Sequence, residues 1–141
     1  MRNELEKKLY DKYPHLFEQR HLNGYQTRMC DGCAHGDGWY NILDKMCIEL
    51  IKIDTEKKIS FSQIKEKFST LRIYFDIKNE ESKILYSKAN QIIFAAETES
   101  CITCEECGKP GNKRPGSWIR TLCDDCDNKI ETINELFLTG E

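Results

Sequence analysis

The sequence predicts an α+β fold: a mostly helical domain with a short antiparallel sheet and a C-terminal four-cysteine zinc-finger unit. Three observations predict it: apolar residues at helical spacing in four segments, one segment that alternates apolar and polar residues, and two C-x2-C pairs near the C-terminus. We expect a helical α+β domain over residues 1–100. A zinc-finger module with a C-terminal helix should follow over residues 101–141, packed with the domain as one compact unit.

The strongest helical pattern follows Gly36-Asp37-Gly38-Trp39. Asp37 is the expected N-cap, because its carboxylate can accept from the free amides of the first turn. The apolar residues then recur with alternating spacings of three and one, as in an amphipathic helix. They are Trp39, Ile42, Leu43, Met46, Cys47, Leu50 and Ile51.

Three further helices are expected over residues 4–13, 81–99 and 124–138. Pro14 ends the first, and the last carries an apolar stripe of Ile130, Ile133, Leu136 and Phe137.

The strand prediction depends on residues 70–77, where Leu71, Ile73, Phe75 and Ile77 alternate with polar or amphipathic residues. Residues 59–67 are expected to form a short strand or turn followed by a short helix. Residues 15–31 show no clear period and are expected to form a loop or an extended segment.

Composition narrows the class of protein. With 21 basic against 24 acidic residues the net charge is −3, which argues against nucleic-acid binding driven by global charge.

No apolar run approaches the roughly 20 residues of a membrane helix. No apolar segment follows the charged N-terminus as in a secretory signal, so we expect a cytoplasmic protein. In a reducing cytosol the 8 cysteines point to metal thiolates before disulfides.

The pattern C-x2-C-x15-C-x2-C predicts one structural zinc site at Cys104, Cys107, Cys123 and Cys126. Gly108 supplies the permissive backbone that a tight knuckle needs after the first pair. The second pair opens a predicted helix, whose free amides favour thiolate charge. A knuckle, a hairpin and a pair at a helix start resemble a treble-clef zinc finger. Four thiolates leave no ligand position for a catalytic water.

Alternatives to this zinc site remain. The cysteines could be free or disulfide-bonded, and an iron–sulfur cluster suits the same spacing. Cys101 forms a further C-x2-C pair with Cys104, but the glycine follows Cys107, which favours Cys104 and Cys107 as the ligands.

A second cysteine group, Cys30 and Cys33 with His35 beside them, is a weaker metal candidate. It could form half of another zinc site, completed by His35, Cys47 or Cys101, or a redox pair. Cys47 lies on the apolar helix face and is expected in the core.

The segment 109–120 is basic and has an aromatic residue, so it is the candidate nucleic-acid surface. The alternative is a solvated hairpin whose Trp118 packs on the zinc knuckle, and the negative net charge favours that alternative. The candidate binding residues are Lys109, Lys113, Arg114, Trp118 and Arg120.

No catalytic constellation is present. The chain has 3 histidines and lacks H-E-x-x-H, a Walker loop and G-x-S-x-G. A small ligand such as a nucleotide signal could still bind beside Trp39.

Four ordered motifs resemble a family of small uncharacterised phage and prophage proteins. The similarity spans roughly residues 33–126, and it implies a zinc-ribbon-like or treble-clef tail and a phage context, hence the cytoplasm of a bacterial host cell, with no transferable activity. Ser69 stands where that family leads us to expect glycine, which suggests that the turn tolerates a side chain. The motifs are Gly36-Asp37-Gly38-Trp39-Tyr40, residues 63–74, Cys104-x2-Cys107-Gly108, and Trp118-x2-Thr121-Leu122-Cys123.

These features together predict a non-enzymatic zinc-binding protein that interacts with a host or phage macromolecule, as a host-takeover or anti-defence factor. Nucleic-acid binding through the basic hairpin 109–120 and small-molecule binding are the two alternatives.

Overall fold

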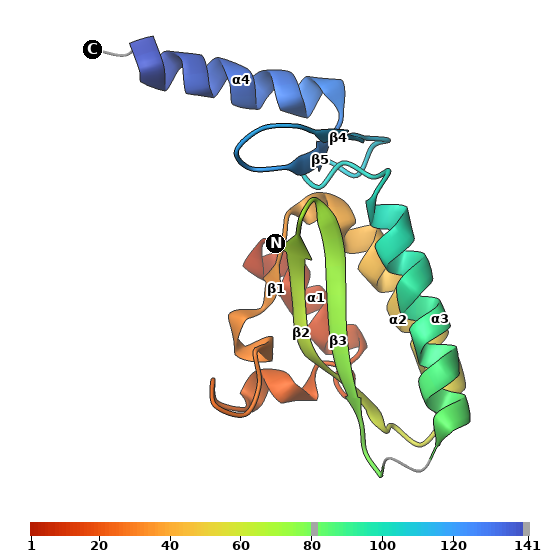
Figure 1. The fold of residues 1–141 in the computed structure, drawn as a ribbon. Helices are drawn as coiled ribbons and strands as arrows, with labels where there is room; N and C mark the ends of the chain where they lie inside the picture. Colours follow the sequence, from red (N-terminus) through yellow and green to blue (C-terminus); the bar gives the residue numbers. More distant parts are fainter. Residues whose placement is uncertain (80–81, 140–141) are drawn as a thin grey trace.

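The computed structural model describes residues 1–79 and 82–139, and over these residues the fold is α+β as predicted (Figure 1). The α-helices are α1 (Asn3–Lys12), α2 (Tyr40–Ile53), α3 (Lys83–Ser100) and α4 (Asp124–Thr139). The strands are β1 (Cys33–Ala34), β2 (Ile59–Lys67), β3 (Thr70–Ile77), β4 (Asn112–Arg114) and β5 (Arg120–Leu122). Short 3-10 helices occupy Glu18–His21, Met29–Asp31 and Asp37–Trp39. None of these helices combines the length and apolar character needed to cross a bilayer.

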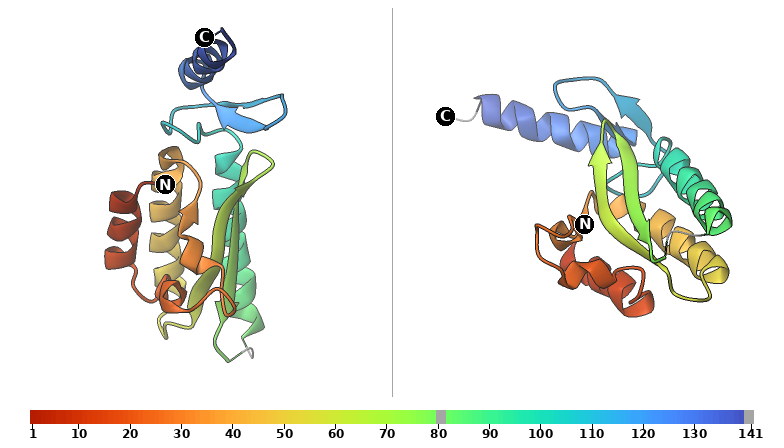
Figure 2. Two further views of the ribbon diagram at one scale, coloured as in Figure 1. Left: turned by 90° about the vertical axis from the view of Figure 1, so that its left-hand side faces the viewer. Right: turned by 60° about the horizontal axis from the view of Figure 1, so that its bottom comes forward.

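The larger sheet has the order β1-β2-β3, with β2 parallel to β1 and antiparallel to β3. Helices α1 and α2 lie on one side of this sheet, and α3 packs against α2 and the edge strand β3 (Figure 2). Within the described residues no α-helix covers the other side. The core between the layers contains the fully buried side chains of Phe17, Trp39, Leu43 and Phe61, so Trp39 at the start of α2 is a central core residue.

The prediction of a short helix within residues 59–67 is wrong, because the whole segment is strand β2. The register against β3 shifts between Phe61 and Gln63, which is a β-bulge. Ile59 and Phe61 are buried before the bulge and Ile64 after it, so the two-residue alternation of apolar residues is interrupted. The interrupted alternation explains why the sequence pattern resembled a helix.

The prediction of Asp37 as the N-cap of α2 is also wrong. Asp37 lies in a 3-10 turn that precedes the helix, and its side chain caps neither element. The carboxylate instead accepts a hydrogen bond of 2.8 Å from the Arg2 backbone N–H and forms an ion pair of 2.8 Å with Arg2 Nε. Asp37 therefore fixes the start of α1 beside the start of α2.

The C-terminal end of α3 supplies hydrogen-bond acceptors to the edge strand β3. Ser100 Oγ accepts from the Leu71 N–H at 2.9 Å, and Glu97 Oε2 accepts from the Ile73 N–H at 3.1 Å. These side chains satisfy amides that an edge strand would otherwise expose to another chain.

We expect Ser100→Ala to lower the free energy of unfolding by about 1–3 kcal/mol, because it leaves the buried Leu71 N–H without an acceptor. Chemical denaturation followed by circular dichroism measures this change. Ser87→Ala on the exposed side of α3 is the matched control and should stay within about 0.5 kcal/mol of the wild type. Equal stability of the two variants would contradict the role given to Ser100.

Candidate metal centre

The first cysteine pair lies in a tight backbone knuckle. The Gly108 N–H donates to the Cys104 carbonyl at 2.9 Å, and the Cys104 N–H donates to the Lys109 carbonyl at 2.7 Å. Gly108 has φ +80°, a left-handed conformation that strongly favours glycine. The knuckle predicted from the glycine after Cys107 is therefore present.

The second pair follows the β4–β5 hairpin and begins helix α4. Cys123 directly precedes α4, and the Cys126 N–H donates to Cys123 Sγ at 3.4 Å. This hydrogen bond stabilises the thiolate and lowers the pKa of Cys123 to about 7. The helix start therefore favours the thiolate of Cys123, whereas desolvation raises the pKa of Cys126.

The structure brings the four predicted cysteines together. Their sulfur atoms all lie within 4.8 Å of one another, and Cys107 Sγ and Cys123 Sγ are 3.6 Å apart. A tetrahedral zinc ion with Zn–S bonds of about 2.3 Å requires sulfur atoms about 3.8 Å apart. The cluster of Cys104, Cys107, Cys123 and Cys126 can therefore hold a metal ion. It is the single such group of three or more His, Cys, Asp or Glu side chains within residues 1–79 and 82–139.

The Gly36–Trp39 segment packs directly on the knuckle, a contact that the sequence did not predict. The Gly38 N–H donates to the Glu105 carbonyl at 2.7 Å, and the Trp39 Nε1–H donates to the Thr103 carbonyl at 2.9 Å. A Cβ on Gly38 would lie 2.6 Å from Gly108 N and closer still to the Cys104 carbonyl oxygen. The two backbones approach so closely that only glycine fits.

A buried carboxylate completes this contact. Glu105 Oε2 accepts from the Gly36 N–H at 2.9 Å, and Glu105 Oε1 lies 3.4 Å from Arg120 Nε. Burial raises the pKa of Glu105, while Arg120 and the Gly36 amide oppose that shift. Glu105 therefore joins the knuckle both to the Gly36–Trp39 segment and to β5.

The β2–β3 turn forms a second contact between the larger sheet and the cysteine-bearing unit. The Thr121 hydroxyl donates to the Ser69 carbonyl at 2.8 Å, and the Glu105 N–H donates to the Thr121 carbonyl at 3.0 Å. Ser69 and Thr121 are both buried. The metal centre is thus packed against the sheet as well as against the start of α2.

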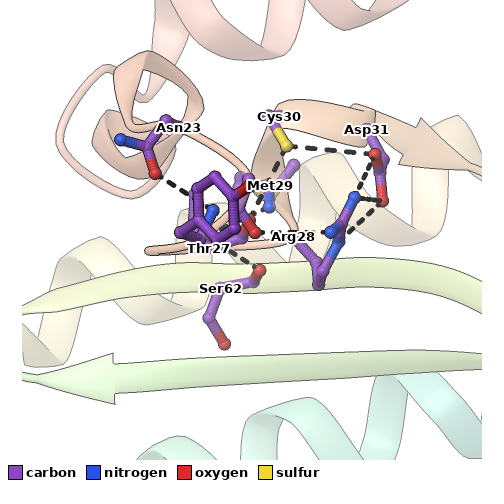
Figure 3. Close-up of polar contacts among 9 residues, drawn as sticks. Asn23, Thr27, Arg28, Met29, Cys30, Asp31 and Ser62 are labelled. Carbon is purple, nitrogen blue, oxygen red and sulfur yellow. Dashed lines mark hydrogen bonds and ion pairs between the residues drawn. The ribbon is translucent and has the colours of Figure 1, made fainter.

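The remaining cysteines lie outside the cluster. Cys101 is exposed, with its thiol 3.6 Å from the Glu97 carbonyl, and Cys47 is buried in the core as predicted. Cys30 contacts the Thr27 carbonyl and Asp31, which also binds Arg28 (Figure 3). Cys33 and His35 are buried nearby, yet among the described residues they do not combine with other ligands into a second metal group.

The basic hairpin is largely committed to internal ion pairs. Arg114 pairs with Asp124 at 2.7 Å and lies 3.7 Å from Asp127, while Arg120 pairs with Glu105 and Glu106. Of the four cations in the predicted nucleic-acid surface, Arg114 and Arg120 are thus in ion pairs, and the other two are Lys109 and Lys113.

The expectation that Trp118 packs on the knuckle is wrong. Trp118 is 71% exposed, and the Arg120 guanidinium lies 5.5 Å from its ring centroid. Trp39, beside which a small ligand was considered, is fully buried with its indole N–H bound to Thr103, so it presents no surface to a ligand.

A scan against protein-family models, a search of the curated proteins and a search of the solved structures find no significant match to this chain. The arguments for function therefore depend on the residues themselves.

We expect Cys107→Ser to abolish stoichiometric metal binding, while Cys101→Ser keeps about one metal ion per chain. The reason is that Cys107 belongs to the cluster and Cys101 lies outside it. Elemental analysis of the purified proteins measures both outcomes. Metal loss in Cys101→Ser would show that Cys101 is a ligand. Iron in the purified protein, with a visible charge-transfer band, would show that the site holds an iron–sulfur cluster and not zinc.

We expect Gly38→Ala to lower the free energy of unfolding of the metal-loaded protein by about 1–3 kcal/mol, because the new methyl group meets fixed backbone. Urea denaturation measures the change. Gly24→Ala is the control, since its Cβ would have nothing nearer than 3.7 Å. If Gly38→Ala were as stable as Gly24→Ala, the backbone around Cys104 and Gly108 would have to shift at little energetic cost, and the close packing would not require glycine.

Proposed function

We propose that this protein is a non-enzymatic, zinc-stabilised binding protein whose metal centre is structural. The observation that supports it best is the closed four-cysteine cluster, because four thiolates complete a tetrahedral zinc site. The cluster also joins three parts of the chain: the knuckle, the hairpin and the first turn of α4. Zinc would therefore stabilise the C-terminal unit and its packing against Gly36–Trp39, with an apparent binding free energy on the order of 10 kcal/mol.

Helix α4 supports a role in binding a protein partner. Its first turn is anchored by Cys126, and Ile130 packs against the small apolar cluster of Cys104, Leu122 and Cys123. Beyond this point α4 projects away from the body of the molecule (Figures 1 and 2). Its stripe continues there with Ile133, Leu136 and Phe137 exposed to solvent, Phe137 by 82%. Apolar side chains presented on a projecting helix are typical of helix-in-groove recognition.

The charge of α4 favours a protein over a nucleic acid as its partner. Asp124, Asp125, Asp127, Glu131 and Glu135 contribute five negative charges against one positive charge from Lys129; the ion pair of Asp124 with Arg114 of the hairpin offsets one more, which leaves −3. A helix of that charge repels phosphate groups. The apolar stripe of α4 therefore suits an apolar groove on a protein.

The proposed partner is a host or phage macromolecule in the cytoplasm of a bacterial cell, with host takeover or anti-defence as the role. The support for this context is the resemblance of the ordered motifs to small phage and prophage proteins. Nucleic-acid binding through hairpin 109–120 is the weaker alternative, because Arg114 and Arg120 are held in ion pairs.

We expect Ile133→Glu to abolish capture of the partner from a bacterial lysate, because a charge in the apolar stripe cannot enter an apolar groove. Zinc content should stay unchanged, since Ile133 lies beyond the anchored turn. The measurement is affinity capture with quantitative mass spectrometry, together with light scattering to detect self-association.

Asn128→Glu is the matched control, because it adds the same charge at an exposed position of α4 away from the stripe. It should capture the partner as the wild type does. Equal capture by Ile133→Glu and Asn128→Glu would reject α4 as the binding element.

A further inference from the structure

The uncovered side of the larger sheet carries three rows of paired side chains beside the β2–β3 turn. The register pairs Gln63 with Tyr74, Lys65 with Arg72, and Lys67 with Thr70. The alternate positions, Ile64, Ile73 and Leu71, are buried in the core, so these three pairs face outward. Arg72 and Lys67 are exposed, and Tyr74 is 45% exposed.

The middle row places two cations directly opposite each other. Cβ atoms of directly opposed residues lie about 4.5–5.5 Å apart, and like charges in such a pair destabilise a sheet. Lys65 and Arg72 form such a like-charge pair, and Lys67 adds a third cation one row further along. An anion bound over this row would relieve the repulsion.

The turn that joins β2 and β3 exposes an aromatic ring in an unfavourable backbone conformation. Phe68 and Ser69 have φ 51° and 73°, the left-handed values of a two-residue hairpin turn that favours glycine or asparagine. Phe68 is nevertheless 68% exposed, with Lys67 Nζ 5.7 Å from its ring centroid. A bulky residue in this conformation stores strain, which structures retain most often at functional sites.

The acidic groups near this surface each accept a hydrogen bond from another group, and Glu97 is also close enough to Arg72 for the guanidinium to oppose the rise in its pKa that burial causes. Glu66 lies on the core side and accepts from the Ser69 N–H at 3.0 Å, and Glu97 accepts from the Ile73 N–H at the β3 edge. Asp76, at the far end of the same side, accepts from Gln19 Nε2 at 2.8 Å. The three rows themselves carry three positive charges and no negative one.

We propose that this surface, formed by Gln63, Lys65, Lys67, Phe68, Arg72 and Tyr74, binds single-stranded nucleic acid. The cations would contact phosphates while Tyr74 and Phe68 stack on bases, as on other sheet surfaces that bind single strands. The sheet surface is distinct from α4 and from hairpin 109–120, and it does not depend on the protein partner proposed for α4.

The test is fluorescence anisotropy with labelled oligo(dT) and oligo(rU) on the zinc-loaded protein. Lys65→Gln/Arg72→Gln should weaken binding about tenfold or more at low salt and reduce the slope of log K against log salt by about 1.4. Tyr74→Ala should weaken binding about tenfold, and Tyr74→Phe should restore it because the stacking ring is kept. Lys8→Gln/Lys52→Gln on exposed helix positions is the charge-matched control and should bind as the wild type does.

Thermal unfolding of the same variants separates binding from folding. Removing the opposed cations should leave the melting temperature unchanged or raise it, so weaker binding would not reflect unfolding. The proposal is overturned if the wild type binds neither oligonucleotide, or if the sheet variants bind as the charge-matched control does. Labelled poly-glutamate serves as a second probe. The proposal is also overturned if this acidic polypeptide binds with the same salt dependence as the oligonucleotides and Tyr74→Ala does not weaken its binding. Each of these outcomes leaves the capture experiment on α4 unaffected.

Discussion

The structure depends on the backbone contact between the Gly36–Trp39 segment and the cysteine knuckle. Glycine at 36 and 38 lets two stretches of main chain meet, and the bonds from the Gly38 amide and the Trp39 indole to the knuckle carbonyls fix their alignment. Because Trp39 also lies at the centre of the core, the metal centre and the larger domain share one packed boundary. The knuckle is therefore part of the fold, and it holds the first residues of α2 in place.

The two proposed binding surfaces differ in chemistry and in their position relative to the cysteine cluster. Helix α4 is acidic with an apolar stripe, and it begins at the cysteine cluster. The outward rows of β2 and β3 are basic and aromatic, and they belong to the larger sheet. Since the net charge of −3 is the sum of such unlike regions, it gives little information about any one surface. The charge that each surface offers to a ligand depends on local pairing. Arg114 and Arg120 form ion pairs with neighbouring carboxylates, whereas Lys65 and Arg72 lie opposite each other on adjacent strands.

Local patterns predicted the local features well. The spacing of apolar residues located α2, and the two cysteine pairs with Gly108 located the cluster, because each signal spans only a few residues. The bulge at Ser62 broke the alternation in β2 and led to a wrong helix prediction. The docking of Gly38 on Cys104 joins residues 66 positions apart in the sequence (104 − 38), and no local pattern records such a contact. The same limit applies to Asp37, whose partner Arg2 precedes α1 and lies 35 positions away in the sequence.

The Thr121–Ser69 hydrogen bond links the cysteine-bearing unit to the turn at the edge of the proposed sheet surface. Thr121 is two residues from Cys123, and Ser69 follows the exposed ring of Phe68 in the same strained turn. A continuous path of covalent and hydrogen bonds therefore runs from a metal-binding thiolate to an aromatic side chain on the sheet. The strand that leads into the cysteine cluster therefore also holds the turn that presents Phe68, so a change in the position of β5 would be felt at that ring.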